Sequence, residues 1–354
     1  MSSTTAGRTA AALIVGLIFQ IACATSEVPA GITGTPPDRL SDRELWQLSE
    51  QFSEPGGTFH SENYISNEQD FQRVIPDLVS RAKPGQLYLG VGPEQNFSYI
   101  AALRPHMVFI VDIRRGNLLE HLLYKAFFEL SASRAQFLSR LFARTMPARL
   151  GPSSSVEDLF AALAQASANE ELFARNLTQA VELLTKTRGF ALSAEDLRQL
   201  ETIYRVGFVA DGPYMMYRRT DGRNAGRRPT YAELMTFDDG TGRQRSYLAD
   251  ESSFVFLKGL HERNLFVPVV GDFGGRKALR AVGTYARTHG LMVSAFYLSN
   301  VEQYLRQDGK YSAFCASVAS MPIDESSTFI RSQSRGGSFR SLLGGMRAET
   351  EKCS

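Results

Sequence analysis

The stretch QLYLGVGPEQNFSYIAALRPHMVFIVD occupies residues 86–112. Its two ends, 86–91 and 107–112, are short apolar runs rich in β-branched and aromatic side chains, which predict two buried strands. A glycine-containing turn and a short helix-like segment lie between them. Strand, loop, helix and strand in this order predict a βαβ unit, in which a helix covers two parallel strands.

Two more apolar runs extend the pattern along the chain. Residues 265–270 (LFVPVV) predict a third strand, in which Pro268 indicates an irregular or locally unpaired position. Residues 291–298 predict a fourth strand, and helices are expected at 117–142 and 276–288 from their apolar spacing. We therefore expect an α/β, Rossmann-like fold with a mostly parallel sheet and helices on both faces.

The rest of the chain divides into segments by composition. Residues 151–206 are rich in Ala, Leu and Glu without a strand candidate, and they predict a helical insertion within a domain that spans 41–331. Ser41 is expected to cap a first helix, and a second helix is expected over 67–80. Residues 25–40 and 332–354 are rich in small, polar or basic residues and predict a flexible linker and a flexible tail.

Composition excludes several classes of protein. The 354 residues are 43% hydrophobic and 21% charged, which is ordinary for a globular chain. With 39 basic and 37 acidic residues the net charge is only +2, too balanced for a nucleic-acid-binding face. No Cys/His cluster has zinc spacing, so we expect no metal site.

The amino terminus predicts export. Arg8 precedes an apolar run from Ala10 to Ala24, which is shorter than the roughly 20 residues that span a bilayer. Cleavage after Ala24 gives a signal peptide of residues 1–24, while acylation at Cys23 gives a lipid-anchored envelope protein; an uncleaved segment in a cytoplasmic protein is the third possibility. In an oxidising compartment Cys315 and Cys353 can pair, or Cys353 stays free.

The turns that follow the predicted strands carry the candidate site. Ligands of open parallel sheets bind outside the carboxyl ends of the strands, where helix-start amides and glycines admit them. Asp112 follows Gly90 by 22 positions, close to the spacing of about 20 at which a carboxylate accepts from ribose hydroxyls. The candidate ligand-binding residues are Gly90, Gly92, Glu94, Asn96, Asp112, Arg114, Asp272 and Asn300.

The glycine spacing favours S-adenosylmethionine over a dinucleotide as the cofactor. A dinucleotide fingerprint requires glycine at position 95, where this chain has Gln95, and Glu94 adds a negative charge where a pyrophosphate would lie. The methyltransferase pattern is met at Gly90 and Gly92, with Tyr88 and Glu94 in place of its acidic residue and third glycine. S-adenosylmethionine carries no phosphate, so it is the expected cofactor. A tight turn at the glycines and a helix cap at Asp112 are the purely structural interpretation.

Long stretches of the chain are also similar to a family of uncharacterised bacterial proteins described as having a class I methyltransferase-like fold. The matching stretches are EPGGTFHSENYISNEQDF (54–71), residues 88–131, NLFVPVVGDFGGRKALRAVGTYARTHG (264–290), FYLSNVEQYL (296–305) and STFIR (327–331). The resemblance implies the fold; the family has no established reaction.

Three hypotheses for function follow. The first is an S-adenosylmethionine-binding methyltransferase that acts on a substrate the sequence does not define. The second is an exported, non-catalytic envelope protein that uses the same scaffold to bind a small molecule or a protein partner. The third is an enzyme that uses Asp272, Glu302 and His121 on another nucleotide-like substrate.

Overall fold

The sheet of the protein has six strands in the order β3-β2-β1-β4-β5-β6. The computed structural model describes residues 1–2, 34–59, 61–218, 228–335 and 338–353. The first five strands pair in parallel and β6 runs antiparallel to β5. The strands are β1 (Leu87–Gly90), β2 (Met107–Asp112), β3 (Phe266–Val270), β4 (Val293–Ser299), β5 (Thr328–Arg335) and β6 (Ser338–Gly345). The expected α/β fold with a mostly parallel sheet is confirmed, as are the four predicted strands.

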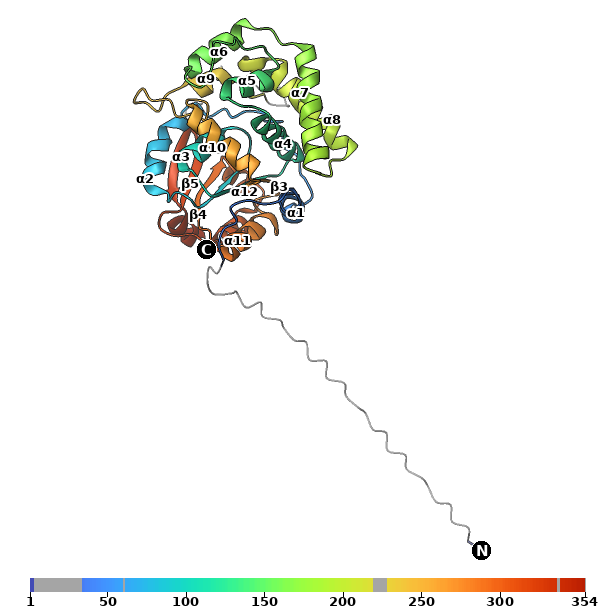
Figure 1. Cartoon of the computed structure of the whole chain (residues 1–354). Coiled ribbons are helices and arrows are strands. Elements are labelled where there is room, and N and C mark those ends of the chain that lie inside the picture. Colours follow the sequence, from blue (N-terminus) through green and yellow to red (C-terminus); the bar gives the residue numbers. More distant parts are fainter. Residues whose placement is uncertain (3–33, 60, 219–227, 336–337, 354) are drawn as a thin grey trace. The chain divides into compact units, whose positions relative to one another are not determined.

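Helices cover both faces of this sheet (Figure 1). One face carries α3 (Gln95–Leu103), α4 (Arg115–Glu129) and α10 (Glu251–Glu262), with α2 (Ile75–Arg81) against α3. The other carries α1 (Asp42–Phe52), α11 (Ala278–Thr288), α12 (Val301–Gln307) and α13 (Tyr311–Ala319). The sheet is therefore shielded from water on both sides, which explains why its inner strands are continuous apolar runs.

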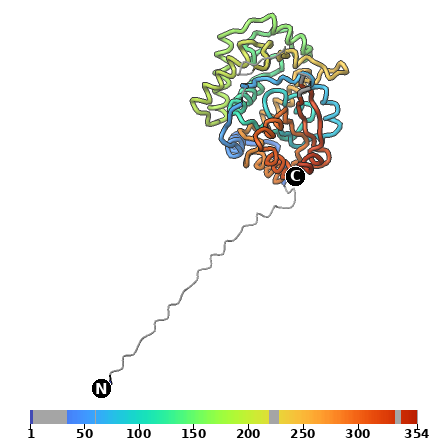
Figure 2. The backbone as a smooth tube through the Cα atoms, turned by 180° about the vertical axis from the view of Figure 1, so that it is seen from behind, coloured from blue at the N-terminus to red at the C-terminus, as the bar shows by residue number. Residues whose placement is uncertain are grey.

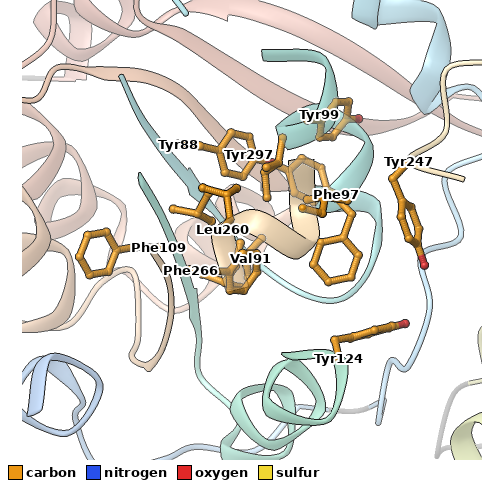
Figure 3. Packing of buried hydrophobic residues seen from close by; sticks show 14 of the residues in the cluster. Tyr88, Val91, Phe97, Tyr99, Phe109, Tyr124, Tyr247, Leu260, Phe266 and Tyr297 are labelled. Atoms are coloured by element: carbon orange, nitrogen blue, oxygen red, sulfur yellow. The ribbon is translucent and has the colours of Figure 1, made fainter. Parts of the chain in front are cut away.

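Aromatic side chains fill the two layers between sheet and helices. On one side Phe97 of α3 packs against Tyr124, Tyr247 and Phe266, with ring centroids 4.9, 5.2 and 5.7 Å away (Figure 3). On the other side Phe109 of β2 packs against Phe52 of α1 at 5.8 Å. Burial of such large rings is the main favourable contribution to folding.

The segment 151–206, in which a helical insertion is expected, lies within a group of helices. Every regular element between residues 134 and 214 is helical, and these helices gather at one end of the domain, away from α11 and the carboxyl terminus, in both views (Figures 1 and 2). They are α5 (Arg134–Phe142), α6 (Val156–Gln165), α7 (Glu170–Glu182), η2 (Leu183–Thr187), α8 (Ala194–Thr202), η3 (Ile203–Val209) and η4 (Gly212–Tyr214); α9 (Tyr231–Thr236) follows. An ion pair between Arg115 at the start of α4 and Asp196 in α8, 2.9 Å apart, ties this insertion to the sheet domain.

Two predicted helices have different bounds. The segment 117–142 is not one helix, because α4 ends at Glu129 and the Ser133 hydroxyl accepts from the Gln136 amide to start α5. The segment 67–80 is shorter than expected and consists of a 3₁₀ turn, η1 (Phe71–Val74), followed by α2. Pro76 lies in the first turn of α2, where its missing N–H costs no hydrogen bond.

The flexible tail expected at 332–354 is wrong. Residues 328–335 and 338–345 form the antiparallel pair β5–β6, and α14 (Met346–Thr350) and η5 (Glu351–Cys353) follow. The backbone pairing between β5 and β6 and the buried side chain of Met346 order this polar sequence. Its content of Ser, Gly and Arg alone does not indicate such order. Cys353 forms a disulfide with Cys315 of α13, the pairing that the sequence left open.

The expected linker is also shorter than 25–40. Leu40 is buried, and its backbone N–H donates to the carbonyl of Arg263 at 3.0 Å, so the end of this segment packs on the domain. The predicted signal peptide, including Cys23, falls outside the described residues apart from Met1 and Ser2. Within the described part of the chain, no helix is both long enough and apolar enough to cross a bilayer.

Candidate functional site

A cavity of about 370 Å³ lies at the carboxyl edge of the sheet. The strand order reverses between β1 and β4, which is where ligands of doubly wound sheets bind. The turns that follow β1, β2, β3 and β4 all contribute to the wall of this cavity. The rest of the wall comes from residues 111 and 112 of β2, from residues 297 and 299 of β4, from α12 and residues 308 and 310 after it, from Tyr217 and Arg228, from Phe339 of β6, and from residues 58, 59, 63, 66 and 67.

Five of the eight predicted site residues line this one cavity, and three do not. Those in the wall are Gly92, Asp112, Arg114, Asp272 and Asn300. Gly90, Glu94 and Asn96 do not line the cavity and make their contacts within the fold.

Asn96 holds the β1–α3 turn in shape. Its amide nitrogen donates to the carbonyls of Val91, Gly92 and Pro93 at 2.9, 3.3 and 2.8 Å, and its Oδ1 accepts from the Tyr88 hydroxyl at 2.9 Å. Gly90 is required because a Cβ there would overlap Asn96 Oδ1. The first glycine of the predicted loop therefore makes room for an internal side chain and not for a ligand.

Glu94 is also turned inward. It is fully buried, and both of its carboxylate oxygens lie 3.2 Å from the Ser66 amide, which donates to them. Burial raises the pKa of Glu94 to about 8, against a smaller lowering by the Ser66 amide. The side chain is thus largely neutral at pH 7, and the expected negative charge in the turn, which argued against a phosphate-bearing ligand, is absent from the cavity.

Asp112 ends β2 and forms a bidentate ion pair with Arg114. Its Oδ1 accepts from the Arg114 backbone N–H and Nε at 2.9 and 3.0 Å, and its Oδ2 accepts from Nη2 at 3.0 Å. Arg114 Nη1 also donates to the carbonyl of Glu62. A carboxylate has about four acceptor positions, so Asp112 keeps one on Oδ2 for a ligand hydroxyl.

Asp272 belongs to the turn between β3 and α11. Its Oδ2 accepts from Lys310 Nζ at 2.6 Å and its Oδ1 from the Gly274 amide at 2.8 Å. The nearby start of α11 is occupied by the carboxylate of Glu54, which accepts from the amides of Asp272, Lys277 and Ala278 at 3.1, 2.6 and 3.3 Å. The chain itself therefore supplies the anion that this helix start favours.

Sequence reasoning missed the segment that closes the cavity, residues 53–59 and 61–68, which we call the strap. It crosses the carboxyl ends of the strands: Glu54 N–H donates to the Val270 carbonyl at 2.9 Å and Gly57 N–H to the Ile113 carbonyl at 2.8 Å. Asn63 and Asn67 of the strap line the cavity. The segment has no apolar period; apart from its place in the family-like stretch 54–71, its sequence signal is its density of Asn, Ser and Glu.

Three residues of the cavity wall have left-handed backbone conformations. Gly92, Asn63 and Ser299 have φ of +75°, +56° and +49°. Positive φ is costly for residues other than glycine, so the surrounding structure holds Asn63 and Ser299 in these conformations.

The residues of the third hypothesis do not converge. Glu302 accepts from Arg331 at 3.2 Å and does not line the cavity, and neither does His121. His121 is fully buried; its Nε2 donates to the Gly92 carbonyl at 2.9 Å, and burial lowers its pKa to about 4. Asp272 alone of the three lies in the wall. Among the described residues, no three His, Cys, Asp or Glu side chains form a group suited to a metal ion.

These features define the class of protein: an α/β protein with a doubly wound, mostly parallel sheet and a cavity at its switch point. The chain belongs to the family described as Domain of unknown function (DUF7790), whose model matches residues 64–150 and 153–346. No curated protein matches the chain.

Proposed function

We propose that the cavity binds a nucleoside-type small molecule, S-adenosylmethionine, and that the protein is a methyltransferase. The observation that carries this proposal is the convergence of Gly92, Asp112 and Asn300, from three different turns, on one cavity at the switch point. Its volume of about 370 Å³ lies within the range of small-molecule sites, which is roughly 300 to 1,000 Å³.

Asp112 is the proposed contact to the ribose. It stands at the end of the strand next to β1 and retains an acceptor position after its ion pair with Arg114. Because Arg114 holds the carboxylate from three directions, the group is fixed before the ligand arrives, and little side-chain entropy is lost on binding.

Methyl transfer requires mainly that the protein position the reacting groups. The bound cofactor supplies a methyl group on a sulfonium sulfur. The residues of the wall orient the ligands and exclude water, and such positioning can account for a large part of a rate enhancement. The strap contributes to that exclusion because its residues close the cavity above the turns.

Calorimetric titration of the purified protein with S-adenosylhomocysteine tests the proposal. We expect saturable binding by the wild type and a loss of about tenfold or more in Asp112→Asn, since a charge-assisted hydrogen bond contributes about 1.5 to 3 kcal/mol. Asn300→Trp, which fills the cavity from a different turn, is expected to abolish binding. Asp77→Asn, an exposed carboxylate on α2, is the matched control and keeps wild-type affinity. Absence of binding by the wild type at millimolar ligand rejects the proposal.

The disulfide favours the second candidate, an exported protein that binds a small molecule without catalysis. Cys315 and Cys353 are paired, and such bonds persist mainly in oxidising compartments. S-adenosylmethionine is made and kept in the cytosol, so export would separate the protein from it. A reporter fused after Ala24 tests this directly: export of the reporter supports the second candidate, and a purely cytoplasmic reporter supports the first.

A further inference from the structure

A short two-stranded arm forms one wall of the cavity on the side of the helical insertion. We define the arm as residues 215–218 and 228–231. Met216 and Thr230 form an antiparallel bridge, and the Tyr231 N–H donates to the Met215 carbonyl at 2.9 Å. Thr230 also caps α9 through a capping box. The bridge, the hydrogen bond and the helix cap therefore hold both chain segments of the arm in place.

The arm is joined to the strap as well. The Ser61 hydroxyl donates to the carbonyl of Arg218 at 2.8 Å. The arm and the strap thus meet over the cavity, and both supply lining residues. A side chain of this arm that lines the cavity is therefore placed to contact a ligand bound there.

Tyr217 and Arg228 are the two lining side chains of the arm. The guanidinium carbon of Arg228 lies 4.8 Å from the centre of the Tyr217 ring. A guanidinium on an aromatic face is held in position while its N–H groups stay available to bind a carboxylate or a phosphate in two-point contact. The Nε of Arg228 is buried and has no hydrogen-bond partner in the structure.

Most of the other charged side chains in the wall have a charged partner, which distinguishes Arg228 from them. Asp112 is paired with Arg114 and Asp272 with Lys310. Among the described residues, no carboxylate lies within ion-pair distance of Arg228. The remaining acid in the wall, Asp308, interacts with Lys310. A half-buried cation without a counter-charge among these residues favours an anionic ligand group.

We propose that Arg228, seated on Tyr217, is the anion-recognition residue of the cavity, and that the molecule bound against the arm carries a carboxylate or a phosphate. Glu94 does not oppose such a group, since it faces away from the cavity and binds the Ser66 amide. This inference deepens the proposed function: the anionic molecule is the class of substrate that shares the cavity with the cofactor.

Three probes with the same fluorinated ring test the proposal: 4-fluorobenzoate, 4-fluorophenyl phosphate and the neutral 4-fluorobenzamide. Binding of each to the full chain is followed by ¹⁹F NMR line broadening. We expect at least one anion to bind about tenfold or more tightly than the amide. The stronger of the two anions identifies whether the natural group is a carboxylate or a phosphate.

Variants assign the preference to the arm. Arg228→Gln is expected to lower anion affinity to that of the amide, and Arg228→Lys to retain part of it because the charge remains but the two-point contact is lost. Arg218→Gln is the matched control, since Arg218 lies on the same arm, is paired with Asp211 at 2.6 Å and does not line the cavity. If Arg228→Gln unfolds, Tyr217→Leu provides the second test, with a smaller loss of anion affinity.

Equal binding of the three probes overturns the inference, as does no binding of any probe or an unchanged anion preference in Arg228→Gln. The probes are titrated without S-adenosylhomocysteine. An anion preference that depends on Arg228, together with no affinity for S-adenosylhomocysteine, therefore rejects the proposed cofactor and leaves the anion site standing. Affinity for S-adenosylhomocysteine, together with no anion preference that depends on Arg228, rejects the anion site and leaves the proposed cofactor standing.

Discussion

At the scale of single residues, the β1–α3 turn combines an internal support with an outward-facing surface. Asn96 ties three consecutive carbonyls together from behind, while Gly92 and Pro93 face the cavity. The sequence identifies all the polar residues of this turn but not the direction of each side chain. Direction depends on the turn geometry and on Ser66, which is distant in sequence and provides the amide that Glu94 binds.

Substitution at Gly90 tests this support. A Cβ at Gly90 would overlap Asn96 Oδ1 and lie 3.0 Å from the Tyr88 ring, so Gly90→Ala is expected to lower the free energy of unfolding by about 1 to 3 kcal/mol. Gly259→Ala is the matched control, because Gly259 lies within α10 with nothing near its Cβ position. It is expected to stabilise the protein by about 0.5 to 1 kcal/mol in urea unfolding. Equal effects of the two changes would contradict the packing described.

The pKa of Glu94 predicts a dependence of stability on pH. Its folded-state pKa of about 8 exceeds the ordinary value of 4.5, so between these two values the folded protein holds a proton that the unfolded chain releases. The contribution of Glu94 to stability is therefore largest below pH 4.5 and falls as pH rises toward 8, by about 1.4 kcal/mol per unit.

Glu94→Gln removes this dependence while keeping an oxygen for the Ser66 amide. The variant is expected to gain stability relative to the wild type between pH 5 and pH 8, measured by urea unfolding at both values. Glu68 and Glu120 are also buried with raised pKa values, and both interact electrostatically with Glu94, so the difference between the two proteins includes the change in their titration as well. A constant difference across this pH range would show that Glu94 is ionised in the fold.

At the scale of elements, the four strands that are buried along almost their whole length could be predicted from the sequence, and the polar β5–β6 pair could not. Residues 107–112 are buried at every position, so their apolar run is unambiguous. The β5–β6 pair lies at one edge of the sheet, and only backbone pairing and a few buried side chains such as Ile330 distinguish its polar sequence from a tail. Pro268 is compatible with β3 because that strand is also an edge.

The strap is an element without secondary structure, held by side chains that bind helix starts and backbone. Glu54 accepts from two amides at the start of α11, those of Lys277 and Ala278, and from the Asp272 amide in the turn before it. Glu54→Ala is expected to cost about 0.5 to 2 kcal/mol of stability, as the loss of a helix cap does. Hydrogen exchange at Lys277 and Ala278 is expected to accelerate, while exchange in α3 stays unchanged; acceleration in both helices alike would indicate general destabilisation instead.

At the scale of the whole molecule, the cavity lies where four kinds of structure meet. Strand β2 supplies Asp112, the turns after β1 and β4 supply Gly92 and Asn300, and the strap and the arm close the space from outside. The location of the cavity was predictable from the alternation of strands and helices, since parallel strands place their carboxyl ends together. The strap and the arm were not, because they join the site through contacts between distant parts of the chain.

The measurement that tests the central claim most directly is a crystal structure of the protein grown with saturating S-adenosylhomocysteine. The account predicts the ligand in the cavity between β1 and β4, with a ribose hydroxyl within hydrogen-bond distance of Asp112 Oδ2 and the strap closed over it. A ligand bound elsewhere, or a cavity without the ligand at saturating concentration, would contradict the claim.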